Sequence, residues 1–95
     1  MDLSSNDLTE FPVQVKDCPK LKILRLIQNK IQTIPAEFFK SENMQDNLEE
    51  LNINSNPLKE LSPLVKHLQK LIVLGISYTE IEVLPSEIIA LEKLT

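Results

Sequence analysis

The sequence predicts an α/β solenoid, an arc of stacked coils with a short parallel β-sheet on its concave face and short helices or 3₁₀ turns on its convex face. Three observations predict it. One apolar pattern recurs at intervals of 23, 27 and 23 residues, and the apolar residues are mostly Leu and Ile. In each copy a proline follows, and it begins the segment by which the chain returns to the start of the next copy, here called the return segment. The 95 residues suffice for one compact domain.

The expected strands follow the pattern L-x-x-L-x-L-x-x-N. Residues 21–29 read LKILRLIQN, residues 48–56 read LEELNINSN, and residues 71–79 read LIVLGISYT, with Thr79 in place of the final Asn. Residues 2–6, DLSSN, supply the second half of one more copy. Because Leu-x-Leu alternation sends two side chains to one face of a strand and the residue between them to the other, stacked copies predict parallel strands.

The apolar positions of successive copies then form aliphatic columns in the core. We expect three columns: Leu24, Leu51 and Leu74; Leu3, Leu26, Ile53 and Ile76; and Leu8, Ile31, Leu58 and Ile81.

Asn6, Asn29 and Asn56 stand where each strand ends and the chain bends inward. A buried turn leaves backbone N–H and C=O groups without partners, and an Asn amide can donate and accept at once. We therefore expect a ladder of stacked Asn side chains that form hydrogen bonds with the unpaired backbone groups of adjacent turns. The ladder should be weaker at Thr79, whose side chain is shorter. The alternative is that these are ordinary surface Asn residues in turns.

The return segments begin at prolines. Pro12, Pro35 and Pro85 occupy equivalent positions, whereas Pro63 falls one place late. Apolar residues at roughly helical spacing follow, which predicts a short helix or 3₁₀ turn behind each proline.

The longest return segment, residues 36–47, holds the extra residues of the 27-residue copy. Phe38 and Phe39 are expected to pack inward. The polar stretch 41–47 is expected to be a mobile loop, with the alternative that Met44 reaches the core.

The four copies agree at six or seven positions each and resemble the leucine-rich repeat family across essentially all 95 residues. Residues 84–88, LPSEI, are most similar to the 23-residue L-P-x-x-I repeats of intracellular Ras-scaffold and cell-polarity scaffold proteins. The resemblance implies one leucine-rich repeat domain over residues 1–95. Its expected parts are a partial repeat 1–20, repeats 21–47, 48–70 and 71–93, and the start of a further repeat at 94–95.

The concave face of such an arc carries the residues between the Leu positions. The partner-binding residues expected there are Ile23, Arg25, Ile27, Glu50, Asn52, Asn54, Val73, Ser77 and Tyr78. Exposed apolar residues, Ile72 among them, grouped with one Arg and one Tyr are typical of a protein-binding surface. The alternative is that they are neutral, since strands favour β-branched residues anyway.

The charged residues of this face have several possible partners. Arg25 could form an ion pair with Asp2. Glu49 and Glu50 could form ion pairs with Lys22.

Composition excludes several other functions. The net charge of −4 and the pI of about 4.9 disfavour a nucleic acid as partner, because such binding needs clustered Lys and Arg. No apolar run approaches the ~20 residues that span a bilayer, so membrane insertion is not expected. The first residues lack the pattern of a signal peptide and Cys18 is the only cysteine, which favours an intracellular, cytoplasmic protein.

Catalytic and metal-binding motifs are missing. His67 has no Cys or second His at ligand spacing, and one Gly in the chain is too few for a phosphate-binding loop. Cys18 is expected to be a packed thiol rather than a nucleophile. We expect no cofactor and no metal.

The resulting hypothesis is a protein–protein interaction module that is not an enzyme and binds a partner protein, of unknown identity, on its concave face. The alternative is a regulatory or substrate-recognition segment of a larger multidomain signalling enzyme, such as a kinase, a GTPase or a ubiquitin ligase. The chain starts within one repeat and stops as another begins, so we expect a fragment of a longer array. The alternative is self-association through uncapped solenoid ends.

Overall fold

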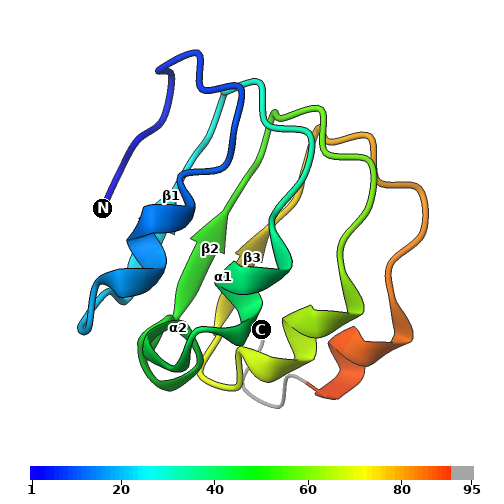
Figure 1. Cartoon of the computed structure of the whole chain (residues 1–95). Helices are drawn as coiled ribbons and strands as arrows, with labels where there is room; N and C mark the ends of the chain where they lie inside the picture. The colour runs from blue at the N-terminus through cyan, green and yellow to red at the C-terminus, as the bar shows by residue number, and fades with distance from the viewer. Residues whose placement is uncertain (91–95) are drawn as a thin grey trace.

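The computed structural model describes residues 1–90, which form an arc of stacked coils (Figure 1). We call residues 1–20 the first coil, 21–47 the second, 48–70 the third and 71–90 the fourth. The expected end of the last repeat at residue 93 and the further repeat at 94–95 lie outside the described residues.

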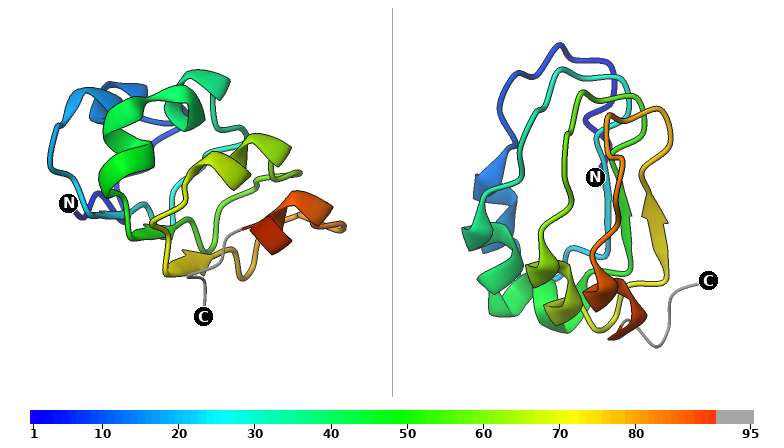
Figure 2. Two further views of the ribbon diagram at one scale, coloured as in Figure 1. Left: turned by 90° about the horizontal axis from the view of Figure 1, so that it is seen from below. Right: turned by 90° about the vertical axis from the view of Figure 1, so that its right-hand side faces the viewer.

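The concave side is a parallel sheet of three short strands. Strands β1 (Ile23–Arg25), β2 (Glu50–Asn52) and β3 (Val73–Gly75) lie in the order β1-β2-β3. The first coil adds an isolated bridge between Asp2 and Arg25. Figure 2 shows the sheet along one side of the arc and the helices along the other. The expected fold class is therefore confirmed.

The strand register reproduces the first aliphatic column. Leu24 pairs with Leu51, and Leu51 pairs with Leu74. Leu24 and Leu51 are fully buried, whereas Leu74 in the fourth coil is partly buried. The second and third columns follow the same trend: their members in the second and third coils are buried, and those in the first and fourth coils are partly buried and pack against this core.

The convex side consists of short helices. They are the 3₁₀ helices η1 (Val13–Asp17), η2 (Pro63–His67) and η3 (Ser86–Ala90) and the α-helices α1 (Ala36–Lys40) and α2 (Glu42–Asn47). Pro12 and Pro35 directly precede η1 and α1. Pro63, one place later in its coil, is the first residue of η2, where its missing N–H costs nothing. In that coil the side chain of Ser62 caps the helix by accepting from the amide of Leu64.

The expectation of a mobile loop over residues 41–47 was wrong. This stretch begins with a helix cap, because the Ser41 hydroxyl accepts a hydrogen bond from the amide of Met44. The helix α2 that follows buries Met44 completely. Phe38 and Phe39 are also fully buried, as expected, and Phe38 packs edge-on against Phe11 at a ring-centroid distance of 4.7 Å. The extra residues of the second coil thus enlarge the core.

Candidate protein-binding face

The parallel register aligns the outward side chains of the sheet in rows. The first row is Ile23, Glu50 and Val73, and the second is Arg25, Asn52 and Gly75, extended by Asp2. Residues after the strands add Ile27, Asn54, Ser77 and Tyr78. Of the apolar members, Ile23, Val73 and Tyr78 are exposed and Ile27 is half-buried. The register therefore places Ile23, Arg25, Glu50, Asn52 and Val73 on one face of the sheet, and their role in binding stays a prediction.

An ion pair lies in the middle of this face. The Arg25 guanidinium donates to Glu50 through Nε at 2.8 Å and through Nη2 at 3.4 Å. The hydrogen bond and the charge of Glu50 raise the pKa of Arg25, so the guanidinium stays charged at neutral pH. Of the pairings left open by the sequence, Arg25 thus takes Glu50 rather than Asp2, and Glu50 takes Arg25 rather than Lys22. Because both side chains stay partly exposed, the pair contributes little stability.

Side chains of the concave face cap the backbone amides just beyond the strands. The Ser4 amide donates to Asp2 Oδ1 and the Asn54 amide donates to Asn52 Oδ1, each two residues back. Hydrogen bonds from Ser4 lower the pKa of the Asp2 carboxyl. The sequence carries a signal for these caps, because an Asp or Asn side chain commonly accepts a hydrogen bond from the backbone amide two residues later.

A second set of caps crosses between coils. The amide of Ile27 donates to the Ser4 hydroxyl, and the amide of Ser77 donates to Asn54 Oδ1 at 2.7 Å. Asn52 and Asn54, which the sequence suggested as partner-binding residues, therefore also have a structural role.

Gly75 faces the side chain of Asn52. A Cβ at position 75 would lie 2.4 Å from Asn52 Oδ1 and 2.6 Å from its Cγ. The backbone of Gly75 does not need glycine for its conformation, because its φ is not positive. The glycine is therefore required by the space that the Asn52 amide occupies while it caps Asn54.

Replacing Gly75 by Ala should push the Asn52 amide away and break its hydrogen bond with the Asn54 amide. We expect a loss of about 1–2 kcal/mol of unfolding free energy, the cost of overpacking together with one lost hydrogen bond. Urea denaturation would measure it.

The matched control is the same substitution in an Asn52→Ala background. There the added methyl group meets no amide, so its cost should fall close to zero. Equal costs of Gly75→Ala in the two backgrounds would contradict the contact.

Buried Asn side chains link the turns of adjacent coils. Asn29 Nδ2 donates to the carbonyls of Leu26 in its own coil and Leu3 in the first coil. Its Oδ1 accepts from the amides of Asn6 and Leu8. Each of its two polar side-chain atoms thus forms hydrogen bonds with two backbone groups.

Asn56 repeats this arrangement one coil further on. Its Nδ2 donates to the carbonyls of Ile53 and Leu26, and its Oδ1 accepts from the amide of Ile31. The hydroxyl of Thr79, the next member, donates to the Ile76 carbonyl and accepts from the Ile81 amide, and both of these groups belong to the fourth coil.

The residue before each of these positions has a left-handed backbone. Ser5, Gln28, Ser55 and Tyr78 have φ values between 57° and 59°. This conformation is uncommon for residues other than Gly, Asn and Asp, and it is unfavourable for a bulky side chain. The turn requires it in every coil, yet in the fourth coil it carries a Tyr that is 89% exposed. Sequence reasoning did not find this strain.

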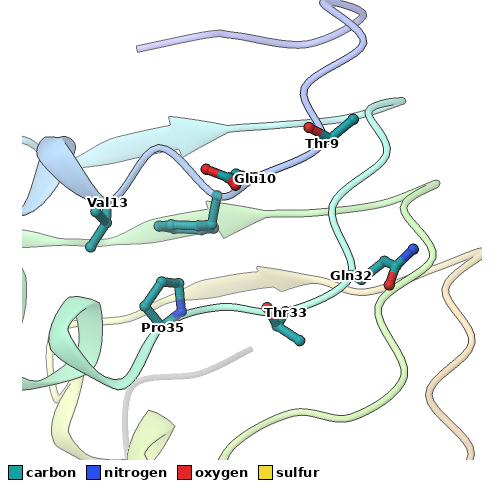
Figure 3. A pocket seen from close by; sticks show the side chains of 7 residues that line it. Thr9, Glu10, Val13, Gln32, Thr33 and Pro35 are labelled. Atoms are coloured by element: carbon teal, nitrogen blue, oxygen red, sulfur yellow. The ribbon is translucent and has the colours of Figure 1, made fainter.

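Open grooves lie between the return segments of neighbouring coils. One, of about 530 Å³, is lined by residues of the first and second coils (Figure 3), namely Thr9, Glu10, Phe11, Val13, Gln32, Thr33 and Pro35. Another, of about 430 Å³, lies between the third and fourth coils and is lined by Lys59, Glu80, Glu82 and Val83. Their recurrence at equivalent places indicates a feature of the repeat rather than a dedicated ligand cavity.

The other singled-out residues lie apart from the concave face. His67 is exposed at the end of η2, and Cys18 is a partly buried free thiol next to η1. Among residues 1–90, no cluster of three or more His, Cys, Asp or Glu side chains could hold a metal ion. In the same part of the chain, no helix has the length and apolar character needed to cross a membrane.

The architecture defines the class of protein as a repeat solenoid, and comparisons give the family. The model of the family described as Leucine Rich Repeat matches residues 47–68. A solved structure of a leucine-rich repeat protein from Leptospira interrogans is similar to the whole chain, with a TM-score of 0.89 and 34% sequence identity. No curated protein matches the sequence. The chain belongs to the leucine-rich repeat family.

The leptospiral protein is much longer than this chain. The match covers 100% of this chain and 23% of the leptospiral one. The resemblance to Ras-scaffold and polarity-scaffold repeats stays a prediction.

Proposed function

We propose that this chain is a protein-interaction module that binds a partner protein on its concave face. Leucine-rich repeats commonly serve as protein-interaction modules, which supports the general class. The single observation that carries the proposal is a set of exposed apolar side chains near a charged pair: Ile23 and Val73 flank Glu50, which pairs with Arg25, and Tyr78 is exposed in the turn after β3. Aromatic and Arg residues are enriched among side chains that dominate binding energy.

The remaining expectations are part of the same proposal. We propose the repeat boundaries 1–20, 21–47, 48–70 and 71–93, an intracellular, cytoplasmic location and a binding rather than a catalytic role. The partner would be a protein rather than a nucleic acid, in line with the net charge of −4.

Affinity capture with this chain as bait, followed by mass spectrometry, would supply the partner for a direct test. We expect Tyr78→Asn to weaken binding of that partner by about tenfold or more, because a large exposed anchor is lost. Asn tolerates the left-handed backbone better than Tyr, so the unfolding free energy should stay unchanged or rise by up to about 1 kcal/mol. Calorimetry of binding and urea denaturation would measure the two effects.

Ser55→Asn is the matched control, since it makes the same change of backbone preference at the equivalent turn without removing an aromatic side chain. It should leave affinity unchanged. If Tyr78→Asn bound the partner as well as the natural chain, Tyr78 would not belong to the binding face.

A further inference from the structure

Two side-chain amides of the third coil are held in one orientation on the concave face. Asn52 Oδ1 accepts a hydrogen bond from the Asn54 amide at 3.1 Å, and Asn54 Oδ1 accepts one from the Ser77 amide at 2.7 Å. Because a backbone N–H can only donate, the atom that caps it must be the side-chain oxygen. The two caps therefore also define where the Nδ2 group of each side chain lies.

The Nδ2 groups of Asn52 and Asn54 are accessible at the surface. Neither has a hydrogen-bond partner within residues 1–90, and both residues are partly buried. In the same part of the chain, no polar side-chain atom of such a residue is buried without a partner, so both Nδ2 groups reach solvent. Among the described coils only the third has two Asn residues here. The equivalent pairs are Asp2 and Ser4, Arg25 and Ile27, and Gly75 and Ser77.

The middle of the concave face thus offers donors, while its acceptors are engaged. The Glu50 oxygens accept from Arg25, and the side-chain oxygens of Asn52 and Asn54 accept from backbone amides. Arg25, which pairs with Asn52 in the sheet register, forms no hydrogen bond through Nη1 within residues 1–90. A partner that covered these N–H groups without accepting from them would lose binding free energy. The face is therefore matched to a partner that presents oxygen acceptors.

Backbone carbonyls fit these donors better than carboxylates do. Glu50 already neutralises the Arg25 guanidinium, and the chain has a net charge of −4, so a further carboxylate would be repelled.

The spacing of the two amides also favours a backbone. The parallel hydrogen bonding continues past β2, because the Gln28 amide donates to the Asn54 carbonyl. The chain is therefore extended from Asn52 to Asn54, and two residues of extended chain span about 6.4–6.8 Å. Carbonyls on one edge of an extended segment recur at the same interval. A helix would not present them, since it uses its carbonyls internally.

We propose that the partner binds as an extended segment that runs along β2, and that Asn52 and Asn54 each donate from Nδ2 to one of its backbone carbonyls. The inference rests on the proposed binding function and adds the conformation of the bound segment and the atoms that recognise it. With one edge toward β2, the segment directs its side chains alternately toward the second and the fourth coil. There they contact the apolar residues Ile23, Ile27 and Val73.

Peptides selected from a phage-displayed library of random linear sequences on the immobilised chain serve as the probe. Asn52→Asp with Asn54→Asp keeps both capping oxygens and removes both Nδ2 donors. Asp2 makes the same cap in the first coil, so the variant should stay folded by circular dichroism. It should bind the peptides about tenfold or more weakly. The loss should persist in about 1 M salt, which screens the two added charges.

Gln28→Glu with Ser55→Asp is the matched control. It adds two charges next to Asn54 and keeps both Nδ2 groups, so in the same salt it should bind as the natural chain does.

Two further measurements do not depend on a variant of the chain. The side-chain amide signals of Asn52 and Asn54 in the ¹⁵N-labelled natural chain should shift when peptide is added. Replacing single peptide bonds of the peptide by esters weakens one carbonyl acceptor at a time without changing any side chain. At two positions, two residues apart, this replacement should lower the affinity several-fold.

Arg25→Ala with Ile27→Ala separates this inference from the concave-face proposal. If that variant lost the peptides while Asn52→Asp/Asn54→Asp bound them normally, the inference would be overturned and the concave-face proposal would stand. Peptides that bound both variants normally would count against both. Peptides that were helical when bound, a consensus rich in Asp and Glu, or a selection that enriched no peptide would also overturn the inference.

Discussion

Ile53→Ala is expected to lower the unfolding free energy by about 2–5 kcal/mol, the range for large-to-small substitutions in a core. Ile53 is 1% exposed and lies in the central column, between Leu26 of the second coil and Ile76 of the fourth. Small domains have total stabilities of about 5–15 kcal/mol, so this single change should remove a large part of the total. Urea denaturation followed by circular dichroism would measure it.

Two further variants check that the loss comes from the cavity. Ile53→Val removes one methyl group and should cost about 1 kcal/mol. Ile76→Ala removes the same atoms from a partly buried site in the same column and should cost clearly less than Ile53→Ala. A loss at Ile76 equal to that at Ile53 would mean that the columns do not pack as described.

Asn56→Ala is expected to cost about 2–4 kcal/mol. Asn56 is 2% exposed, and its loss leaves the amide of Ile31 and the carbonyl of Ile53 without their hydrogen-bond partner. Each unsatisfied buried group costs about 1–3 kcal/mol. The unfolding free energy of the variant, again from urea denaturation, measures the contribution of this one link between the second and third coils.

Asn6→Ala is the matched control for Asn56→Ala. Asn6 occupies the equivalent position in the first coil but is exposed, and its side chain donates one hydrogen bond, to the Leu3 carbonyl. That carbonyl also accepts from Asn29, so the loss should be within about 0.5 kcal/mol. Equal losses at Asn6 and Asn56 would show that burial in the ladder is not what makes Asn56 important.

The fold could be predicted from the sequence because the apolar pattern of the sequence is periodic. Alternation of Leu residues defines which side chains face inward, and the repeat interval defines which strands are neighbours. For the same reason the rows of the concave face, such as Ile23, Glu50 and Val73, could be written before the structure was known. A repeated motif gives the register directly.

Features that depend on one coil alone could not be read in this way. Helix α2 occupies the extra residues of the second coil, where no other copy offers a template, and its polar composition concealed the burial of Met44. Arg25 had several carboxylates within plausible reach, and only side-chain geometry selects Glu50. The contact between Asn52 and Gly75 likewise depends on one side-chain orientation.

The most direct test of the account is the affinity of a captured partner protein for a variant with Ala at Arg25, Ile27 and Tyr78. The matched control carries Ala at Lys40, Lys66 and His67, three exposed residues of the convex helices. If the concave face binds the partner, the concave-face variant stays folded by circular dichroism and loses about a hundredfold or more in affinity, as expected for several interface anchors, while the convex control binds normally. An unchanged affinity of the concave-face variant would contradict the account.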